Sequence, residues 1–215
     1  ASEHNSLNYE LEKSRDGQVW SLVATIAAAG NSTQLLQYHF EDGEAFFAAS
    51  NTNIKIKGST VWIASGGKKA RILKSNDYGK TWKNISNNIP TSPVNVIRED
   101  SENPNLLYVG TDNGAYASFN QGKEWFPFHK GLPNVAIHDL VIQPSAKHLI
   151  LGTHGRSLYK ASIAPLQLMT SEVIVKEAHI FPISTIKKRS TWGNSWGRWS
   201  SPFIPKSSIQ YYLDS

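Results

Sequence analysis

The sequence predicts an all-β fold made of β-propeller-type blades, each with four antiparallel strands. Three segments share one design, an apolar strand followed by a turn with glycine and a second strand: 61–75, 107–119 and 149–161. Their glycines Gly66, Gly110 and Gly152 recur at an interval of roughly 43 residues, the length of one blade. The composition agrees, because 11% of the residues are aromatic and strands favour aromatic side chains.

The remaining strands and turns complete each repeat. A further strand precedes each of the three segments, at "TNIKIKG", "VNVIRED" and "IHDLVIQP". The first two segments end in a turn that closes on tryptophan, "SNDYGKTW" and "SFNQGKEW", and connectors with proline, "NNIPTSP" and "KGLPNVA", follow. One blade cannot bury both faces alone, so we expect three blades stacked side by side over residues 52–164. No segment has a convincing helical period.

The turn "SNDYGKTW" has the spacing of a hairpin stabilised by its own side chains. Ser75 and Asp77 come before Gly79, and Thr81 and Trp82 follow it. An aspartate here can accept hydrogen bonds from backbone N–H groups of its own turn, and glycine permits the positive φ of a tight hairpin. We expect Trp82 to pack between neighbouring sheets, so these residues serve the fold rather than chemistry.

The turn "SFNQGKEW" repeats the pattern with two changes. Ser118, Gly122 and Trp125 are kept, whereas Asn120 replaces the aspartate and Glu124 replaces the threonine. Asparagine can make the same turn, so we expect a hairpin here too.

Both turns resemble the Asp-box (BNR repeat) of sialidases, sortilin-type receptors and related propellers. Residues 74–125, continuing through 131–166, are similar to sortilin-like (VPS10-type) propellers, which in bacteria are described as glycosyl-hydrolase-like. The resemblance implies a propeller. In those families the box lies on the blade rim, away from the catalytic face, so it implies no activity.

The flanking segments resemble other families. Residues 41–82 look like photosystem-assembly-factor (Ycf48-like) propellers, and residues 8–44 look like fibronectin-III-like modules. We therefore expect residues 1–51 to form an N-terminal β module, either fibronectin-III-like or an extra blade. In sortilin-like proteins the chain leaves the propeller for a β-sandwich, so residues 165–215 are expected to be an exit segment that starts such a sandwich.

The composition excludes several kinds of site and bears on where in the cell we expect the protein. The chain has no cysteine, which excludes disulfides, thiolate metal sites and a cysteine nucleophile. No apolar run is long enough to span a membrane, and no signal peptide is visible, so we expect a mature or trimmed form. The seven histidines lack metal-binding spacings, and no cofactor motif occurs, so neither metal nor cofactor is expected. We expect a secreted, cell-surface or periplasmic bacterial protein.

Hydrolase chemistry has little support in the sequence. A glycosidase needs two carboxylates across a cleft, and Glu99, Asp100, Asp112 and Asp139 are available. We interpret Asp112 as a turn residue, and Glu99 and Asp100 as the solvated end of a strand. None of the arginines lies in a pattern that matches the arginine trio of sialidases.

The segment "THGRS" is the strongest candidate for ligand binding. A matching turn follows an inner strand in the resembling propellers, so His154 and Arg156 could face the central channel and bind an anionic or polar ligand. The alternative is that Gly155 makes the turn, His154 is an ordinary polar residue and Arg156 pairs with an acid.

The C-terminal end is basic and rich in tryptophan. In "RSTWGNSWGRWS", Trp192, Trp196 and Trp199 are interleaved with Arg189 and Arg198, a combination that could stack on sugars or bases and contact an anionic polymer. Packing of these rings across a closing blade is the open alternative.

Together these patterns favour a non-enzymatic propeller that binds a protein or a glycan at a bacterial surface or envelope. A fragment of a glycoside hydrolase of the sialidase or xyloglucanase type, and a structural assembly factor, are the alternatives. Three or four blades do not obviously close a ring, so partner chains could complete it.

Overall fold

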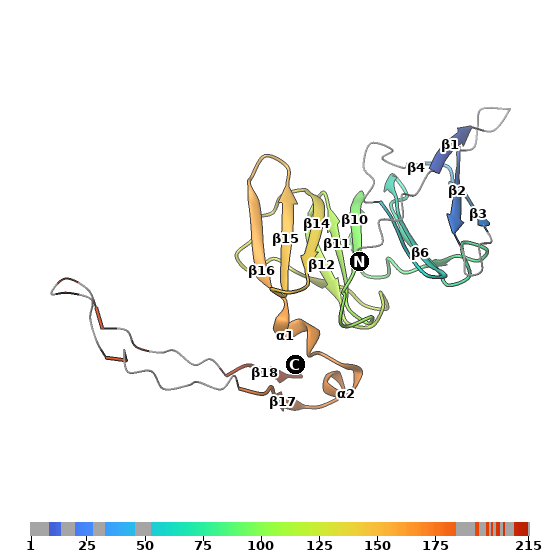
Figure 1. Ribbon diagram of the computed structural model, residues 1–215. Helices are drawn as coiled ribbons and strands as arrows, with labels where there is room; N and C mark the ends of the chain where they lie inside the picture. The colour runs from blue at the N-terminus through green and yellow to red at the C-terminus, as the bar shows by residue number, and fades with distance from the viewer. Residues whose placement is uncertain are drawn as a thin grey trace. The chain divides into compact units, whose positions relative to one another are not determined.

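The computed structural model describes residues 9–13, 20–27, 33–45, 53–183, 192–193, 197, 199, 201–202, 204 and 209–214 (Figure 1). The chain divides into two compact units, Ala1–Gln167 and Leu168–Ser215. In its described residues the first unit is all-β apart from one short helix, and it holds the repeated sheets that the sequence predicted.

The N-terminal sheet is an antiparallel meander of three strands. These are β1 (Tyr9–Lys13), β2 (Trp20–Ala27) and β3 (Thr33–His39). A two-residue strand, β4 (Glu44–Ala45), then pairs with β7 (Gly66–Gly67). The backbone thus joins the N-terminal part of the chain to the first repeated sheet.

Two four-stranded antiparallel sheets follow, each in simple chain order apart from the insertion of β7. The first contains β5 (Ile54–Lys57), β6 (Thr60–Ala64), β8 (Ile72–Ser75) and β9 (Lys83–Asn84). The second contains β10 (Val94–Glu99), β11 (Leu107–Thr111), β12 (Gly114–Ser118) and β13 (Phe126–Pro127). These are propeller-type blades, and the fold class that the sequence predicted is confirmed.

The third repeat forms a sheet of three described strands. They are β14 (Ile137–Gln143), β15 (His148–Thr153) and β16 (Leu158–Ser162). The chain then enters a one-turn helix, α1 (Ala164–Gln167), where the two earlier sheets have a turn and a fourth strand. In the described residues the third sheet therefore has three strands, and no fourth strand directly follows β16.

Apolar residues of neighbouring sheets form three buried clusters. Leu36, Tyr38 and Phe40 of the N-terminal part pack with Val61 and Ile63 of the first blade. A second cluster joins the first blade to the second, and a third joins the second blade to β14–β16. Each sheet buries apolar side chains against its neighbour, as stacked blades require.

A buried carboxylate fixes β4 against the first blade. The Glu44 side chain is fully buried and accepts hydrogen bonds from Tyr38, Ser65 and Arg71, with an Arg71 Nη2 to Oε2 distance of 2.7 Å. Arg71 also pairs with Glu41. Burial opposes the ionisation of Glu44, but the hydrogen bonds outweigh it and lower the pKa of this carboxyl.

The second unit contains α2 (Ser171–Ile174) and an antiparallel pair, β17 (Ala178–Ile180) with β18 (Tyr211–Leu213). Phe181 is buried and lies edge-to-face against His179. The Tyr212 hydroxyl donates to the carbonyl of Ile174, 3.1 Å away. The predicted boundaries at residues 51 and 164, and the fibronectin or blade character of residues 1–51, stay predictions.

One interpretation of a strand end is wrong. Asp100, expected on a solvated face, is only 1% exposed. Its carboxylate accepts hydrogen bonds from the backbone N–H groups of Glu102 and Asn103 and from the Gln167 amide. A buried carboxylate needs such donors, so Asp100 caps the turn between β10 and β11 instead of facing water.

Candidate ligand-binding surface

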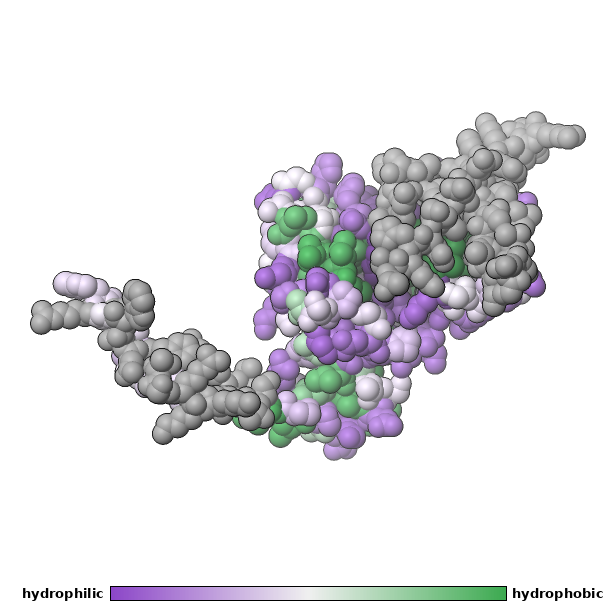
Figure 2. Space-filling view, viewed as in Figure 1, coloured by the Kyte–Doolittle hydropathy of each residue, from purple (hydrophilic) through white to green (hydrophobic). Residues whose placement is uncertain are grey.

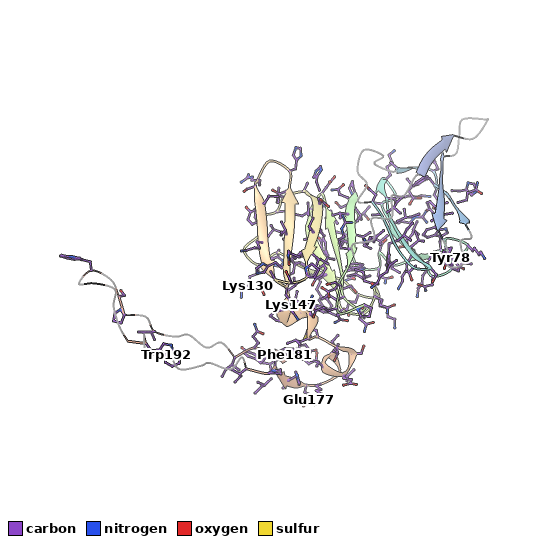
Figure 3. The ribbon with its side chains drawn as sticks, viewed as in Figure 1. Tyr78, Lys130, Lys147, Glu177, Phe181 and Trp192 are labelled. Carbon is purple, nitrogen blue, oxygen red and sulfur yellow. The ribbon has the colours of Figure 1, made fainter. Side chains whose placement is uncertain are left out.

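The turn between β8 and β9 is held by its own polar side chains. Ser75 donates to Asp77 (2.7 Å) and accepts from the N–H of Gly79 (2.8 Å). Asp77 accepts from the hydroxyl and the N–H of Thr81, at 2.6 and 2.9 Å. These hydrogen bonds lower the pKa of Asp77 to about 2. The bonds from the Thr81 hydroxyl and N–H have the largest effect, followed by the bond from Ser75. Tyr78, labelled in Figure 3, follows Asp77 and packs on the first cluster.

The turn between β12 and β13 has the same arrangement with an amide in place of the carboxylate. Ser118 donates to the Asn120 amide oxygen (3.0 Å) and accepts from the N–H of Gly122 (2.8 Å). The Asn120 oxygen accepts from the N–H of Glu124 at 2.9 Å. The backbone bond thus survives both sequence changes, because it needs only an oxygen acceptor.

The two tryptophans that close these turns differ in burial. Trp125 is 2% exposed, and its indole N–H donates to the Ile85 carbonyl, 2.7 Å away. The Asn88 side-chain amide accepts a hydrogen bond from the N–H of Trp125 and donates one to its carbonyl. Trp82 is half-buried, with its ring edge-to-face on Tyr38 at 5.5 Å between centroids. Both rings pack on cores rather than facing an open surface.

The first strands of the three blades, β5, β10 and β14, lie side by side and carry charged residues. Lys57 on β5 pairs with Glu99 on β10, at 2.6 Å from Nζ to Oε1. Arg98 on β10 pairs with Asp139 on β14, at 3.2 Å from Nη2 to Oδ1. Among the described residues, no carboxylate lies within ion-pair distance of Lys55, the other cation on β5.

Lys55, Arg98 and Val141 occupy equivalent positions of the three first strands. Each is paired with the residue that lies two before Ala64, Gly110 or Gly152 on the next strand. Two cations therefore stand in one row on neighbouring strands, and Val141 beside them is 49% exposed. The row therefore lies on the first strands, which contact one another from blade to blade.

The electrostatics of the row favour an added negative charge. Burial lowers the pKa of Lys55, and the positive charges of Arg98 and Lys57 lower it further. Burial also lowers the pKa of Arg98, and Asp139 partly offsets this effect. Like charges that are partly desolvated repel, so an anion held between Lys55 and Arg98 would relieve both effects.

At the start of the first strands the second and third blades meet, because the Asn95 amide donates to the Ile137 carbonyl, 3.2 Å away. Asn95 and His138 each sit at a β-bulge, and bulges re-aim side chains. Asn95 donates to Asp112, at 2.8 Å. The ring of His138 stacks on that of His154, with 5.0 Å between centroids. Arg156 is exposed, and no acid of the described residues pairs with it.

The carboxylates near this surface are engaged in structural bonds. Asp139 accepts from Arg98 and from the N–H of Leu140, and Asp112 accepts from Asn95. The carboxyl groups with shifted pKa values, Glu41, Glu44 and Asp77, are all shifted down. A general acid for glycoside cleavage needs a raised pKa, so these groups do not suit that role.

The predicted tryptophan cluster is described only in part. Trp199 is fully exposed and Trp192 is partly buried. Trp196, Arg189 and Arg198 lie outside the described residues. The described part of the cluster belongs to the second unit, whereas His154 and Arg156 belong to the first.

The cation row is the feature that sequence reasoning missed. Lys55 and Arg98 fall in two different predicted strands, "NIKIKG" and "VNVIRED", and neither stands in a recognisable motif. The glycine repeat could not align them, because the residue of the first blade that is equivalent to Gly110 is Ala64 rather than Gly66. The buried Glu44 and Arg71 pair was missed as well, because these two residues also lie in separate segments of the chain.

Two further findings concern metal sites and membrane spans. In the part of the chain that the structure describes, no group of three or more metal-ligating side chains is arranged to hold a metal ion. The same part contains no helix that is long and apolar enough to cross a membrane.

Comparison with known proteins supports the fold. The chain matches no protein-family model. It is 27% identical to rat (Rattus norvegicus) sortilin over 74 residues, which are 34% of this chain and 9% of sortilin. The chain thus spans less than a tenth of the length of the curated relative that it matches.

The solved structures with similar architecture include a bacterial enzyme. The GH74 enzyme of Niastella koreensis aligns with 74% of this chain and 27% of its own, with a TM-score of 0.55 and 15% identity. A structure of YCF48 bound to D1 peptide aligns with 76% of this chain and 57% of its own, with a TM-score of 0.43 and 13% identity. The similarity to the Niastella enzyme shows a propeller fold and no more.

Proposed function

We propose that this chain is a non-enzymatic propeller module that binds a protein or a glycan through an anionic group of that partner. The observation that supports this is the row formed by Lys55 and Arg98. Two cations stand on neighbouring first strands, with Arg98 partly buried and Lys55 exposed, and Lys55 has no carboxylate within ion-pair distance in the described residues. A carboxylate or sulfate would supply the missing charge-assisted bonds.

The turn at His154 and Arg156 extends this proposed surface toward the ends of the strands. Asp139 follows His138 directly in β14 and pairs with Arg98, so the stacked histidines lie next to the cation row along the chain. Arg156 offers a planar group with five donors, which suits carboxylates and sulfates. We propose that the protein meets its partner at a bacterial surface or in the envelope, which fractionation of the source cells would test.

The test is a binding measurement with matched charge changes. A heparin oligosaccharide and an oligoglutamate peptide would be titrated into the full chain and into the Lys55→Gln and Lys80→Gln variants. Both variants lose one positive charge, but Lys80 is an exposed residue of the turn between β8 and β9. We expect Lys55→Gln to weaken binding about tenfold, the value of a charge-assisted hydrogen bond, and Lys80→Gln to change it little.

Equal effects of the two substitutions would refute the site, because binding would then follow net charge alone. The glycoside-hydrolase alternative needs a separate assay. Turnover of aryl β-glucosides or aryl sialosides above the buffer background, lost on substitution of Asp112 or Asp139, would show an enzyme and overturn the non-enzymatic proposal.

A further inference from the structure

The outer strands of the first two blades pair with their neighbouring strands through the same hydrogen bonds. In the first blade, Lys83 and Asn84 of β9 pair with β8, and the N–H of Ile85 donates to the Ile72 carbonyl at 2.8 Å. In the second, β13 pairs with β12, and the N–H of Phe128 donates to the Ala115 carbonyl at 2.8 Å. Both segments read tryptophan, two residues of strand, then an apolar residue: 82–85 and 125–128.

On the third blade, the edge that would pair with such an outer strand is the outer edge of β16. Leu158 pairs with Gly152 as Ala115 pairs with Gly110, so the Leu158 carbonyl is the matching acceptor. The residues that follow β16 form α1, and among the described residues none pairs with the outer edge of β16. Figure 1 shows β16 as the last strand of its sheet. An unpaired edge strand is a template for another extended segment.

One apolar side chain at this edge, Leu158, is uncovered. Ile85 packs in the same buried cluster as Ile72, and Phe128 packs against the cluster that contains Ala115. Leu158, in contrast, is 71% exposed. In Figure 2 the green, apolar surface of this sheet lies mainly over its middle strands. An apolar residue placed as Ile85 is in the first blade would cover Leu158.

One residue of β16, Lys160, favours a particular charge in a strand that pairs with this edge. Lys160 pairs with Ile150 at the place that Ala117 holds in the second blade and Lys74 in the first. The residue opposite this place is the one directly after the tryptophan, Lys83 in the first blade. Oppositely charged cross-strand pairs are favourable, so an acidic residue suits the position opposite Lys160.

We propose that the outer edge of β16 binds an extended segment of a partner protein, which becomes the fourth strand of the sheet. Four consecutive residues of this segment are, in order, tryptophan, an acidic residue, any residue, and an aliphatic or aromatic residue. The N–H of the last residue donates to the Leu158 carbonyl. The indole N–H of its tryptophan donates to the Phe128 carbonyl, as the indole N–H of Trp125 donates to the Ile85 carbonyl. This edge is separate from the cation row, because β16 is the last strand of its sheet and the row lies on first strands.

The probe is a synthetic peptide with the sequence of residues 80–86 that carries Lys83→Glu. Its affinity for the full chain would be measured by fluorescence anisotropy and compared with that of the unchanged peptide. A favourable cross-strand ion pair predicts roughly 2–5-fold tighter binding of the acidic peptide. Lys160→Glu in the protein should reverse this preference. Lys123→Glu, a change of equal charge at an exposed turn residue, should leave the preference as it is.

Two peptide variants test the geometry. Ile85→Pro removes the N–H that is meant for Leu158, and Trp82→Ala removes the ring, so each should abolish measurable binding. Hydrogen exchange of residues 158–162 should slow when the acidic peptide is bound. No binding at millimolar peptide, binding that survives Ile85→Pro, or unchanged exchange in β16 would each overturn the proposal.

Discussion

Replacing Gly110 by alanine should expose how tightly the second and third blades pack. A Cβ atom on Gly110 would lie 2.7 Å from Ile137 Cγ2, 2.7 Å from Val96 Cγ1 and 2.9 Å from Ile137 Cβ. Real side chains do not approach so closely, and both neighbours are fully buried, so one of the strands must move. Overpacking of this kind costs about 1–3 kcal/mol of unfolding free energy.

Gly152 is the matched control, since it holds the same place in the third repeat. A Cβ there would meet nothing nearer than 3.6 Å, and Gly152→Ala should be neutral or stabilise by about 0.4–1 kcal/mol through the unfolded state. The two substitutions should thus differ by roughly 1–4 kcal/mol in urea unfolding followed by far-UV circular dichroism.

A double-mutant cycle identifies the cause. Val96→Ala removes one of the two methyl groups that a Cβ on Gly110 would meet, so it should cost less in the Gly110→Ala background than alone. Equal effects of Gly110→Ala and Gly152→Ala, or additive effects of the double change, would show that the blades are not in the close contact described above.

Three further changes test the turns and the buried network. Trp125→Ala should cost about 3–5 kcal/mol and Trp82→Ala clearly less, because Trp82 is half-buried; urea unfolding giving the reverse order would contradict the burial. The folded pKa of Asp77, about 2, lies below its ordinary value of 3.8, so its stabilisation is present above pH 4 and lost towards pH 2; Asp77→Asn and the parent should then converge in urea midpoint. Glu44→Ala should cost about 2–3 kcal/mol in the same assay, since Glu41 would be the one carboxylate left to Arg71 among the described residues, and a neutral result would refute the network.

The repeat made the blades predictable from the sequence. Glycines, turn residues and tryptophans at a fixed interval depend on local backbone geometry, and local geometry is encoded by neighbouring residues. This is why the turns at Ser75 and Ser118 and the strands between them could be placed before the structure was known.

The charged contacts could not be placed in this way. Lys55 and Arg98, or Glu44 and Arg71, meet only when separate strands are brought into register, and nothing local marks one as the neighbour of the other. Asp100 shows the same limit, since a carboxylate at the end of a strand reads as solvated until Gln167, far along the chain, covers it.

The sequence by itself determined that this protein folds into stacked antiparallel blades, because the interval of its turns leaves one way to bury the apolar faces. Only the tertiary structure decided which side chains and strand edges come together at the surface. It aligned two cations on neighbouring first strands and ended the third sheet at β16, and both results depend on strand pairings that no single stretch of the chain contains.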